Sequence, residues 1–331
     1  MIYRKFGKTG LKVSEIGYGA WGIGGPAMAG EIPIGWGNVD DNTSIKALEK
    51  AYDLGVTFYD TADFYGLGHS EELIGKTLSG KKNIIIATKV GHRLANNGRI
   101  ILDYSKEHIL QACEKSLKRL KRETIDLYQL HSAKLNHLEQ GECIEAMEQL
   151  KKDGKIKYWG LSLSTFEPEP EANFLMKNNL GSSFQIVFNI LNQKGLMTIQ
   201  DAGKNGYGVI ARMPLQFGLL TGKFNKNTKF EKNDHRASRL TPEILSEALD
   251  SLDDVWTLAN KYGISKTSIS LSFILSMPEI STVIPGIKTP EQAILNTNDL
   301  VKLSQEDRDF LIEMYKKKFY EIVELMQKRY Q

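Results

Sequence analysis

Short apolar runs alternate with amphipathic helical patterns along most of this chain, and this alternation limits the folds open to it more than any other feature. Strands that alternate with helices are typical of a parallel sheet covered by helices. The candidate strands are residues 14–17, 57–60, 84–89, 125–131, 158–161, 184–188, 208–212 and 282–284. Eight such strands in 331 residues predict an α/β fold of the closed (β/α)8 TIM-barrel type.

Helical patterns fill the gaps between these strands, and two later helices begin at well-marked caps. Thr289 is followed by Pro290 and Gln292, which combines an N-cap, a proline at the first helical position and a glutamine at the third. Thr241 and Pro242 repeat the first two signals. The other expected helices cover residues 43–54, 70–78, 106–120, 138–151, 168–178 and 194–205.

The two ends and one internal segment depart from the repeating pattern. Residues 3–13 predict a β-hairpin that closes the bottom of the barrel, and residues 304–331 predict a charged amphipathic helical extension packed outside it. Residues 214–240 are rich in Gly, Lys and Asn and lack periodicity, so we expect a functional loop over a ligand. No linker or internal repeat divides the sequence, and we predict one domain over residues 1–331.

Charge and hydropathy exclude several classes of partner. The chain has 43 basic and 40 acidic residues, a net charge of +3, which predicts no basic face for nucleic acid or an anionic membrane. No apolar stretch approaches the roughly 18 residues that span a bilayer, and the first residues contain no signal-peptide run. We therefore expect a cytoplasmic monomer or weak homo-oligomer whose partner is a small molecule.

A glycine-rich motif at residues 17–22 matches the G-x-G-x-x-G pattern of dinucleotide-binding folds, with Asp40 and Asp41 at about the expected distance beyond it. That motif binds phosphate only where a helix begins at its last glycine. The glycines and prolines of residues 23–37 cannot continue as such a helix. We interpret the motif as a glycine-rich loop.

Polar residues stand at or just beyond the ends of successive predicted strands. Asp60, Lys89 and His131 each close an apolar run, and Tyr65 follows shortly after Asp60. In a (β/α)8 barrel the carboxyl ends of the strands face the active site, so these four side chains are expected at one mouth. Each one alone has an ordinary structural explanation, but four complementary groups together favour a function.

The chemistry follows from pairing these groups. A tyrosine phenol is a weak acid at neutral pH, and a nearby ammonium such as that of Lys89 makes its proton easier to give. Asp60 would hold Lys89 by a charge-assisted hydrogen bond, and His131 could orient a carbonyl oxygen. The set suits carbonyl reduction, with Tyr65 as the proton donor.

A second constellation lies at residues 284–289, where the last strand joins a capped helix. Free backbone N–H groups, a helix dipole and Lys288 meet at this point, where phosphate groups bind in many barrels. We interpret the segment as a phosphate site, ahead of an ordinary loop.

At these residues the sequence resembles the aldo-keto reductase family. The resemblance rests on residues 59–66 with Ser70 and Glu71, on Thr88 with Lys89, and on residues 128–131. It continues through residues 160–162, 184–185, 214–223 and 284–286 as far as Gln292 and Asn296. The order and coverage of these segments make the match specific.

The resemblance implies an NADP(H)-dependent oxidoreductase that reduces an aldehyde, ketone or sugar carbonyl, or catalyses the reverse reaction, with NADPH/NADP+ bound across the barrel mouth and NADH left open as an alternative. It implies the catalytic tetrad Asp60, Tyr65, Lys89 and His131. It also implies the cofactor contacts Trp21, Asp60, Ser162, Gln185, Arg212, Leu215, Gly218, Leu220, Lys223, Gly286, Lys288, Thr289, Gln292 and Asn296. Within this set Lys288 favours a 2′-phosphate, whose charge it would neutralise.

Three positions depart from the family pattern and bear on the substrate. Leu163 stands where Asn is common, which removes one hydrogen bond to the carboxamide, and Ser132 stands where Trp is common, which leaves more room in the pocket. Arg212 replaces a frequent tyrosine and could stack on the nicotinamide or bind an anionic substrate. Trp21, Trp36 and Phe64 are candidates for aromatic walls, with core packing an equal alternative.

Two other function classes stay open. Some related proteins, the potassium-channel β subunits, resemble this chain and use the cofactor to sense redox state in a regulatory subunit. A metal-dependent barrel hydrolase would need clustered His and carboxylate ligands. The chain has only six histidines, and four of them fall in loops or at helix starts, so no metal site is predicted.

Overall fold

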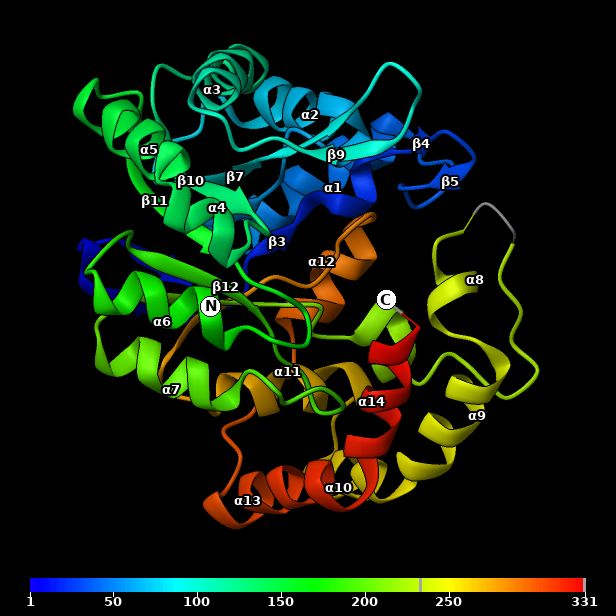
Figure 1. The fold of residues 1–331 in the computed structure, drawn as a ribbon. Helices are drawn as coiled ribbons and strands as arrows, with labels where there is room; N and C mark the ends of the chain where they lie inside the picture. The colour runs from blue at the N-terminus through cyan, green and yellow to red at the C-terminus, as the bar shows by residue number, and fades with distance from the viewer. Residues whose placement is uncertain (232–233, 330–331) are drawn as a thin grey trace.

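Eight parallel strands form the centre of the molecule, and helices surround them (Figure 1). The computed structural model describes residues 1–231 and 234–329. The strands are β3 (Tyr18–Gly19), β6 (Phe58–Asp60), β7 (Ile85–Val90), β10 (Ile125–His131), β11 (Ile156–Ser162), β12 (Ser183–Val187), β13 (Gly208–Arg212) and β14 (Ile280–Val283). They follow one another in chain order, and bridges from Ile16 to Val283 and from Gly19 to Gly286 join the first strand to the last. The predicted (β/α)8 barrel is confirmed.

The first barrel strand lies further along the chain than predicted. The apolar run at 14–17 led us to start it at Ser14, but Ser14 ends β2 (Lys12–Ser14), which pairs with β1 (Tyr3–Lys5) in an antiparallel hairpin. Ser14 and Thr57 exchange backbone-to-hydroxyl hydrogen bonds of 2.9 Å in both directions, which ties the hairpin to the start of β6. The start of this apolar run therefore belongs to the hairpin, and the first barrel strand begins only after it.

The hairpin closes the bottom of the barrel, as predicted. Phe6 and Val13 are fully buried and belong to one apolar cluster with interior residues of the strands, among them Phe58, Leu127 and Ile210. The Phe6 ring lies directly over Gly208, where an added Cβ would stand 2.6 Å from a ring atom. A side chain at residue 208 would push this plug out of the barrel.

Helices form the outer layer, and most begin close to their predicted positions. Thr241 and Thr289 cap α9 and α12, since each side chain accepts a bond from the helix's first turn. The helix predicted over 138–151 is divided in two, because Gly141 adopts a left-handed conformation with φ of 86° between α4 and α5. The helices are α1 (Asp41–Asp53), α2 (His69–Leu78), α3 (Lys106–Leu120), α4 (Leu135–Gln140), α5 (Glu142–Lys152), α6 (Glu169–Lys177), α7 (Leu196–Lys204), α8 (Arg236–Arg239), α9 (Pro242–Ser251), α10 (Asp253–Tyr262), α11 (Lys266–Leu275), α12 (Pro290–Thr297), α13 (Gln305–Met314) and α14 (Tyr320–Lys328).

Several segments add detail that periodicity did not predict. The C-terminal extension consists of α13 and α14 joined by a π-helical turn, η5 (Tyr315–Phe319), and α14 lies beside α9 (Figure 1). The segment 214–240 contains a 3-10 turn, η4 (Gln216–Thr221), as well as α8; residues 232 and 233 of this predicted loop lie outside the described residues. Two small hairpins complete the fold, β4 (Met28–Ala29) with β5 (Ile32–Pro33) and β8 (His92–Leu94) with β9 (Ile100–Leu102). Within the described part of the chain, no helix is long and apolar enough to cross a membrane.

Candidate active site

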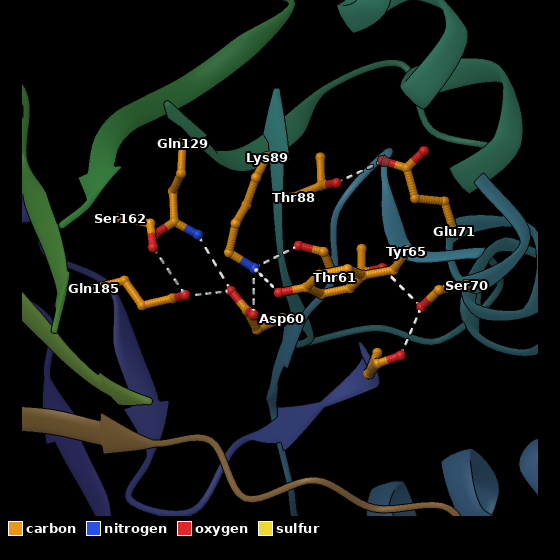
Figure 2. Close-up of polar contacts among 11 residues, drawn as sticks. Asp60, Thr61, Tyr65, Ser70, Glu71, Thr88, Lys89, Gln129, Ser162 and Gln185 are labelled. Carbon is orange, nitrogen blue, oxygen red and sulfur yellow. Dashed lines mark hydrogen bonds and ion pairs between the residues drawn. The ribbon is translucent and has the colours of Figure 1, made fainter. Parts of the chain in front are cut away.

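A buried ion pair lies at the carboxyl ends of β6 and β7. Strand alternation turns Asp60 and Lys89 into the barrel, where both side chains are inaccessible or nearly so. The Lys89 ammonium donates to Asp60 Oδ1 at 2.6 Å, to the Thr61 carbonyl at 2.8 Å and to the Tyr65 hydroxyl at 3.3 Å (Figure 2). All three ammonium donors thus have an acceptor, which a buried charge requires.

The second oxygen of Asp60 is held by two side-chain amides, one from β10, next to β7, and one from β12. Gln185 Nε2 donates to Oδ2 at 2.7 Å and Gln129 Nε2 donates at 3.2 Å, and Ser162 donates to Gln185 Oε1 at 3.4 Å (Figure 2). We call Asp60, Lys89, Gln129 and Gln185 the polar floor. Gln129 is a residue that the sequence reasoning missed; its signal was a polar side chain at an inward position of an otherwise apolar strand, two residues before His131.

Tyr65 is carried by a tight turn, η3 (Tyr65–Gly68), directly after β6. The turn fits only because Gly66 has φ of 61° and lies so close to Gly24 that an added Cβ would overlap the Gly24 carbonyl oxygen. Ser70 braces the same loop, since its hydroxyl contacts that of Thr61 at 2.8 Å and donates to the Ala20 carbonyl at 3.0 Å. The close approach at Gly66 and the hydrogen bonds of Ser70 therefore fix the turn that carries the Tyr65 phenol.

The ionisation of the pair favours a protonated phenol beside a charged ammonium. Burial raises the pKa of Tyr65, and the Lys89 ammonium opposes that rise. Burial alone would lower the pKa of Lys89, but the facing Asp60 and Tyr65 raise it above its ordinary value. The phenol keeps its proton at neutral pH, while Lys89 stands ready to stabilise the phenolate left when that proton is given up.

His131 ends β10 next to Tyr65, with ring centroids 5.9 Å apart. Burial, with the nearby His92 and Lys89, holds the pKa of His131 well below its usual range, so the imidazole is neutral and has one N–H to donate. His92 stacks beside it with ring centroids 4.2 Å apart, and burial lowers the pKa of His92 to about 4. The sequence reasoning placed His92 in a loop and gave it no role.

Arg212 ends β13 with its guanidinium on the same mouth. It donates to the Leu163 carbonyl at 3.1 Å and to the Thr165 hydroxyl at 3.2 Å, and burial lowers its pKa. Leu163 itself is fully buried, so it offers its backbone rather than a side-chain amide to this mouth. The positive charge of Arg212 also acts to lower the pKa of Tyr65.

The loop between β14 and α12 brings together the residues expected at the adenosine end of a cofactor. Gln292 Oε1 accepts the Lys288 backbone N–H at 2.7 Å, and Asn296 donates to the Gly286 carbonyl at 3.4 Å. Thr289 caps α12, and the space where a Cβ of Gly286 would stand is open. The five residues predicted here are thus linked in one segment, the β14–α12 loop and the first turns of α12: Gly286, Lys288, Thr289, Gln292 and Asn296.

The residues expected at the pyrophosphate lie on or beside η4. Gly218 takes φ of 95° and donates to the Leu215 carbonyl at 2.8 Å, which sets the tight turn. Lys223 is exposed, whereas the Leu220 side chain is fully buried. Leu220 therefore offers only its backbone to a ligand at this place.

Four rings lie together above Tyr65, and we call Trp21, Trp36, Phe217 and His235 the aromatic cover. The Trp21 ring stacks on Tyr65 at 6.0 Å and meets Trp36 at 5.5 Å. The ring of His235 lies 4.7 Å from Trp21, 4.4 Å from Trp36 and 5.3 Å from Phe217. Of the three predicted aromatic walls, Trp21 contacts Tyr65, Trp36 contacts Trp21, and Phe64 meets His92 edge-on at 5.6 Å.

The glycine-rich motif is a support beside the site. Residues 20–24 form a short 3-10 helix, η2 (Ala20–Gly24), and no α-helix starts from it. An added Cβ at Gly22 would stand 2.7 Å from Lys288 Cγ, so this glycine makes room for the lysine side chain. The absence of a side chain at residue 22 therefore leaves space for the Lys288 side chain of the neighbouring loop.

No three of the His, Cys, Asp and Glu residues in the described ranges are grouped so that they could hold a metal ion. The chemistry visible at the mouth is that of a tyrosine, a lysine, a carboxylate and neutral imidazoles.

Comparison with known proteins gives a consistent result. Residues 15–315 match the Aldo/keto reductase family. The aldo-keto reductase YhdN of Bacillus subtilis (strain 168) is 32% identical over 88% of this chain and 86% of its own length. A putative voltage-gated potassium channel subunit beta of Schizosaccharomyces pombe is 30% identical over 89% of this chain and 86% of its own length. The solved structure of the glycerol dehydrogenase AKR11B4 of Gluconobacter oxydans, 27% identical, superimposes with a TM-score of 0.79 over 96% of this chain and 95% of that one.

Proposed function

The chain belongs to the aldo/keto reductase family, and we propose that it is an NADP(H)-dependent oxidoreductase that reduces an aldehyde, ketone or sugar carbonyl to the alcohol, or catalyses the reverse. The observation that carries the proposal is the 3.3 Å contact between the Lys89 ammonium and the Tyr65 hydroxyl, inside a mouth where Asp60 keeps that ammonium charged. This contact pairs a proton donor with the charge that stabilises its conjugate base.

In the proposed reaction the carbonyl carbon gains a hydride and the carbonyl oxygen gains the Tyr65 proton. NADPH, when bound at the mouth, would supply the hydride and would be oxidised to NADP+. Tyr65 gives its proton to the oxygen as negative charge develops there, and Lys89 stabilises the phenolate that remains. His131, neutral because its pKa is lowered, donates a hydrogen bond to the same oxygen and holds it near the phenol.

The residues of the mouth fit a nicotinamide dinucleotide. Lys288 offers a cation to phosphate, and the open space at Gly286 lets a ligand approach the backbone there. Arg212 brings a planar guanidinium whose Nε is buried without a hydrogen-bond partner. Ser162 and Gln185 would contact the carboxamide, for which Gln185 would exchange part of its present bonding to Asp60.

Replacement of Tyr65 by Phe tests the proposal. We expect Tyr65→Phe to lower kcat by about 1,000-fold, because positioned proton transfer is worth roughly 100- to 10,000-fold. NADPH binding, measured by fluorescence titration, should change little, since the hydroxyl acts on the transition state. Tyr104→Phe removes a buried hydroxyl that binds the His131 carbonyl, and it serves as a matched control expected to retain most activity. Full turnover by Tyr65→Phe with NADPH and a panel of carbonyl compounds would refute Tyr65 as the acid.

A second candidate function is a cofactor-binding regulatory subunit, which the similarity to the potassium channel subunit beta favours. Such a protein would bind NADPH tightly and turn over carbonyl compounds slowly, if at all. Tight NADPH binding combined with no reduction of any aldehyde, ketone or sugar in the panel would favour this alternative.

A further inference from the structure

A cavity of about 300 Å³ lies beside the tetrad at the mouth of the barrel. Two of its lining residues come from the loop after β10 and one from α14, and the others come from the loop after β11: Ser132, Lys134, Ser164, Thr165, Phe166, Glu167 and Gln327. Its size falls within the range of small-ligand pockets. The nicotinamide and phosphate contacts proposed above involve none of these residues.

The wall of the cavity is continuous with the reacting groups. Ser132 directly follows His131 and adopts φ of 67°, and its backbone N–H donates to the Ser162 carbonyl at 3.0 Å. On the other side, Thr165 accepts a hydrogen bond from Arg212 at 3.2 Å, and the charge of Arg212 acts on Tyr65.

The lining suits a neutral ligand rich in hydroxyl groups. Three hydroxyls, one amide, one ammonium and one carboxylate line the space together with the apolar ring of Phe166, so donors and acceptors are mixed beside one apolar surface. The charges of Lys134 and Glu167 balance, and Gln327 Nε2 donates to Glu167 at 3.0 Å. A phosphate would meet the Glu167 carboxylate unfavourably, whereas alcohol groups can donate to it.

We propose that this cavity binds the hydroxylated arm of the substrate, so that the enzyme prefers neutral polyhydroxylated aldehydes or ketones, the sugar class, over apolar carbonyl compounds of the same length. The inference rests on the proposed function, because it deepens the substrate class of the same site. Ser132 is the specificity-determining residue, since a larger side chain at this position would fill the cavity next to His131.

The test compares glyceraldehyde with propanal, which have the same number of carbons. With NADPH, the wild-type protein should show a kcat/KM for glyceraldehyde about tenfold or more above that for propanal, as two additional hydrogen bonds would give. Ser132→Trp should reduce this ratio to near one while the propanal value changes little. Ser164→Leu, which removes a hydroxyl from the other loop, should reduce the ratio independently if the first variant fails to fold. An unchanged ratio in a folded variant overturns the proposal.

Two further arms separate the inference from the proposed function. Saturation-transfer NMR with erythritol, which carries no carbonyl, should detect binding to the wild-type protein and loss of binding in Ser132→Trp. Binding of erythritol without reduction of any carbonyl would preserve the cavity assignment and refute the reductase. A strong preference for glyceraldehyde 3-phosphate over glyceraldehyde would instead assign the cavity to an anionic group and overturn the neutral class.

Discussion

The polar floor and the aromatic cover both contact Tyr65, the floor through Lys89 and the cover through Trp21, and they do so by different physical interactions. In the floor, Asp60 and Lys89 are joined to their neighbours by directional hydrogen bonds of 2.6 to 3.3 Å. In the cover, His235 and the two tryptophans meet through ring contacts of 4.4 to 5.5 Å, which tolerate small shifts and rotations. The polar floor therefore fixes the position of the Tyr65 hydroxyl and its proton, and the aromatic cover determines how well this group is shielded from solvent.

The two regions also differ in where their residues come from. The floor draws its side chains from β6, β7, β10 and β12, which belong to one continuous sheet; the first three are adjacent, and β11 separates β10 from β12. The cover draws its rings from segments far apart in the chain, before α1 and between β13 and α9. Regular strands position their side chains precisely, whereas loops are more variable in sequence and conformation.

The largest effect should come from breaking the floor. Lys89→Met leaves the Asp60 carboxylate buried without its cation, which costs about 3 to 5 kcal/mol in the free energy of unfolding and should abolish measurable turnover. Urea unfolding at pH 7 measures the first effect, and NADPH oxidation measures the second. Lys157→Met removes a comparable ion pair with Asp126, but Lys157 is 54% exposed, so this control should lose no more than about 1 kcal/mol. Equal losses in the two variants would contradict the special role of the floor.

A smaller effect should appear in the cover as the pH falls. Burial lowers the pKa of His235 to about 4, while an unfolded chain has a histidine pKa near 6.5. Below pH 6.5 the unfolded state takes up a proton that the folded state does not, so stability declines as the pH falls from 6.5 toward 4. Between pH 7 and 5, this single group should account for about 2 kcal/mol of the loss.

His235→Gln isolates this contribution. The variant should lose about 2 kcal/mol less stability between pH 7 and 5 than the wild-type protein does, as measured by urea unfolding at both pH values. His131 also has a lowered pKa and remains in both proteins, so some acid sensitivity should persist. Identical pH dependence in the two proteins would mean that His235 is not enclosed by the cover in solution.

The smallest effect should come from the weakest bond of the floor. Gln129 donates to Asp60 at 3.2 Å, and its own Oε1 is buried without a hydrogen-bond partner. Gln129→Met removes both the bond and the unsatisfied oxygen, so the cost should be only about 1 kcal/mol. Thermal unfolding measures this change, and kcat should fall by less than about tenfold because Lys89 and Gln185 still hold the carboxylate. A loss as large as that of Lys89→Met would mean that the floor acts as one unit.

The sequence predicted the floor better than the cover. Asp60 and Lys89 could be placed because each ends an apolar strand, and strand ends converge in a closed barrel. Gln129 was missed because the reasoning attended to the last residue of β10 and not to the inward position two residues earlier. His235 could not be found, because its partners Trp21 and Trp36 lie some 200 residues earlier in the sequence and no periodicity links them.

Element boundaries depended on single residues whose conformation the pattern did not reveal. Gly141 divides a predicted helix because it adopts a left-handed conformation, and a glycine is equally common inside loops and at helix ends. The first strand was predicted at 14–17, but Ser14 pairs within the hairpin, while Ile16 forms the bridge to the last barrel strand. Periodicity identifies buried faces, but it does not say which neighbour buries them.

The plug formed by Phe6 over Gly208 has a practical consequence for anyone who would redesign this protein. Because the hairpin seals the amino-terminal ends of the strands, a ligand enters and leaves only at the opposite end. Substitutions that tighten the plug should raise thermal resistance without altering selectivity, and substitutions around Ser132 should alter selectivity with little change in thermal resistance. The free-energy effects of substitutions at distant sites that share no partners are additive. Thermal resistance and selectivity can therefore be improved separately, and the substitutions can then be combined in one chain.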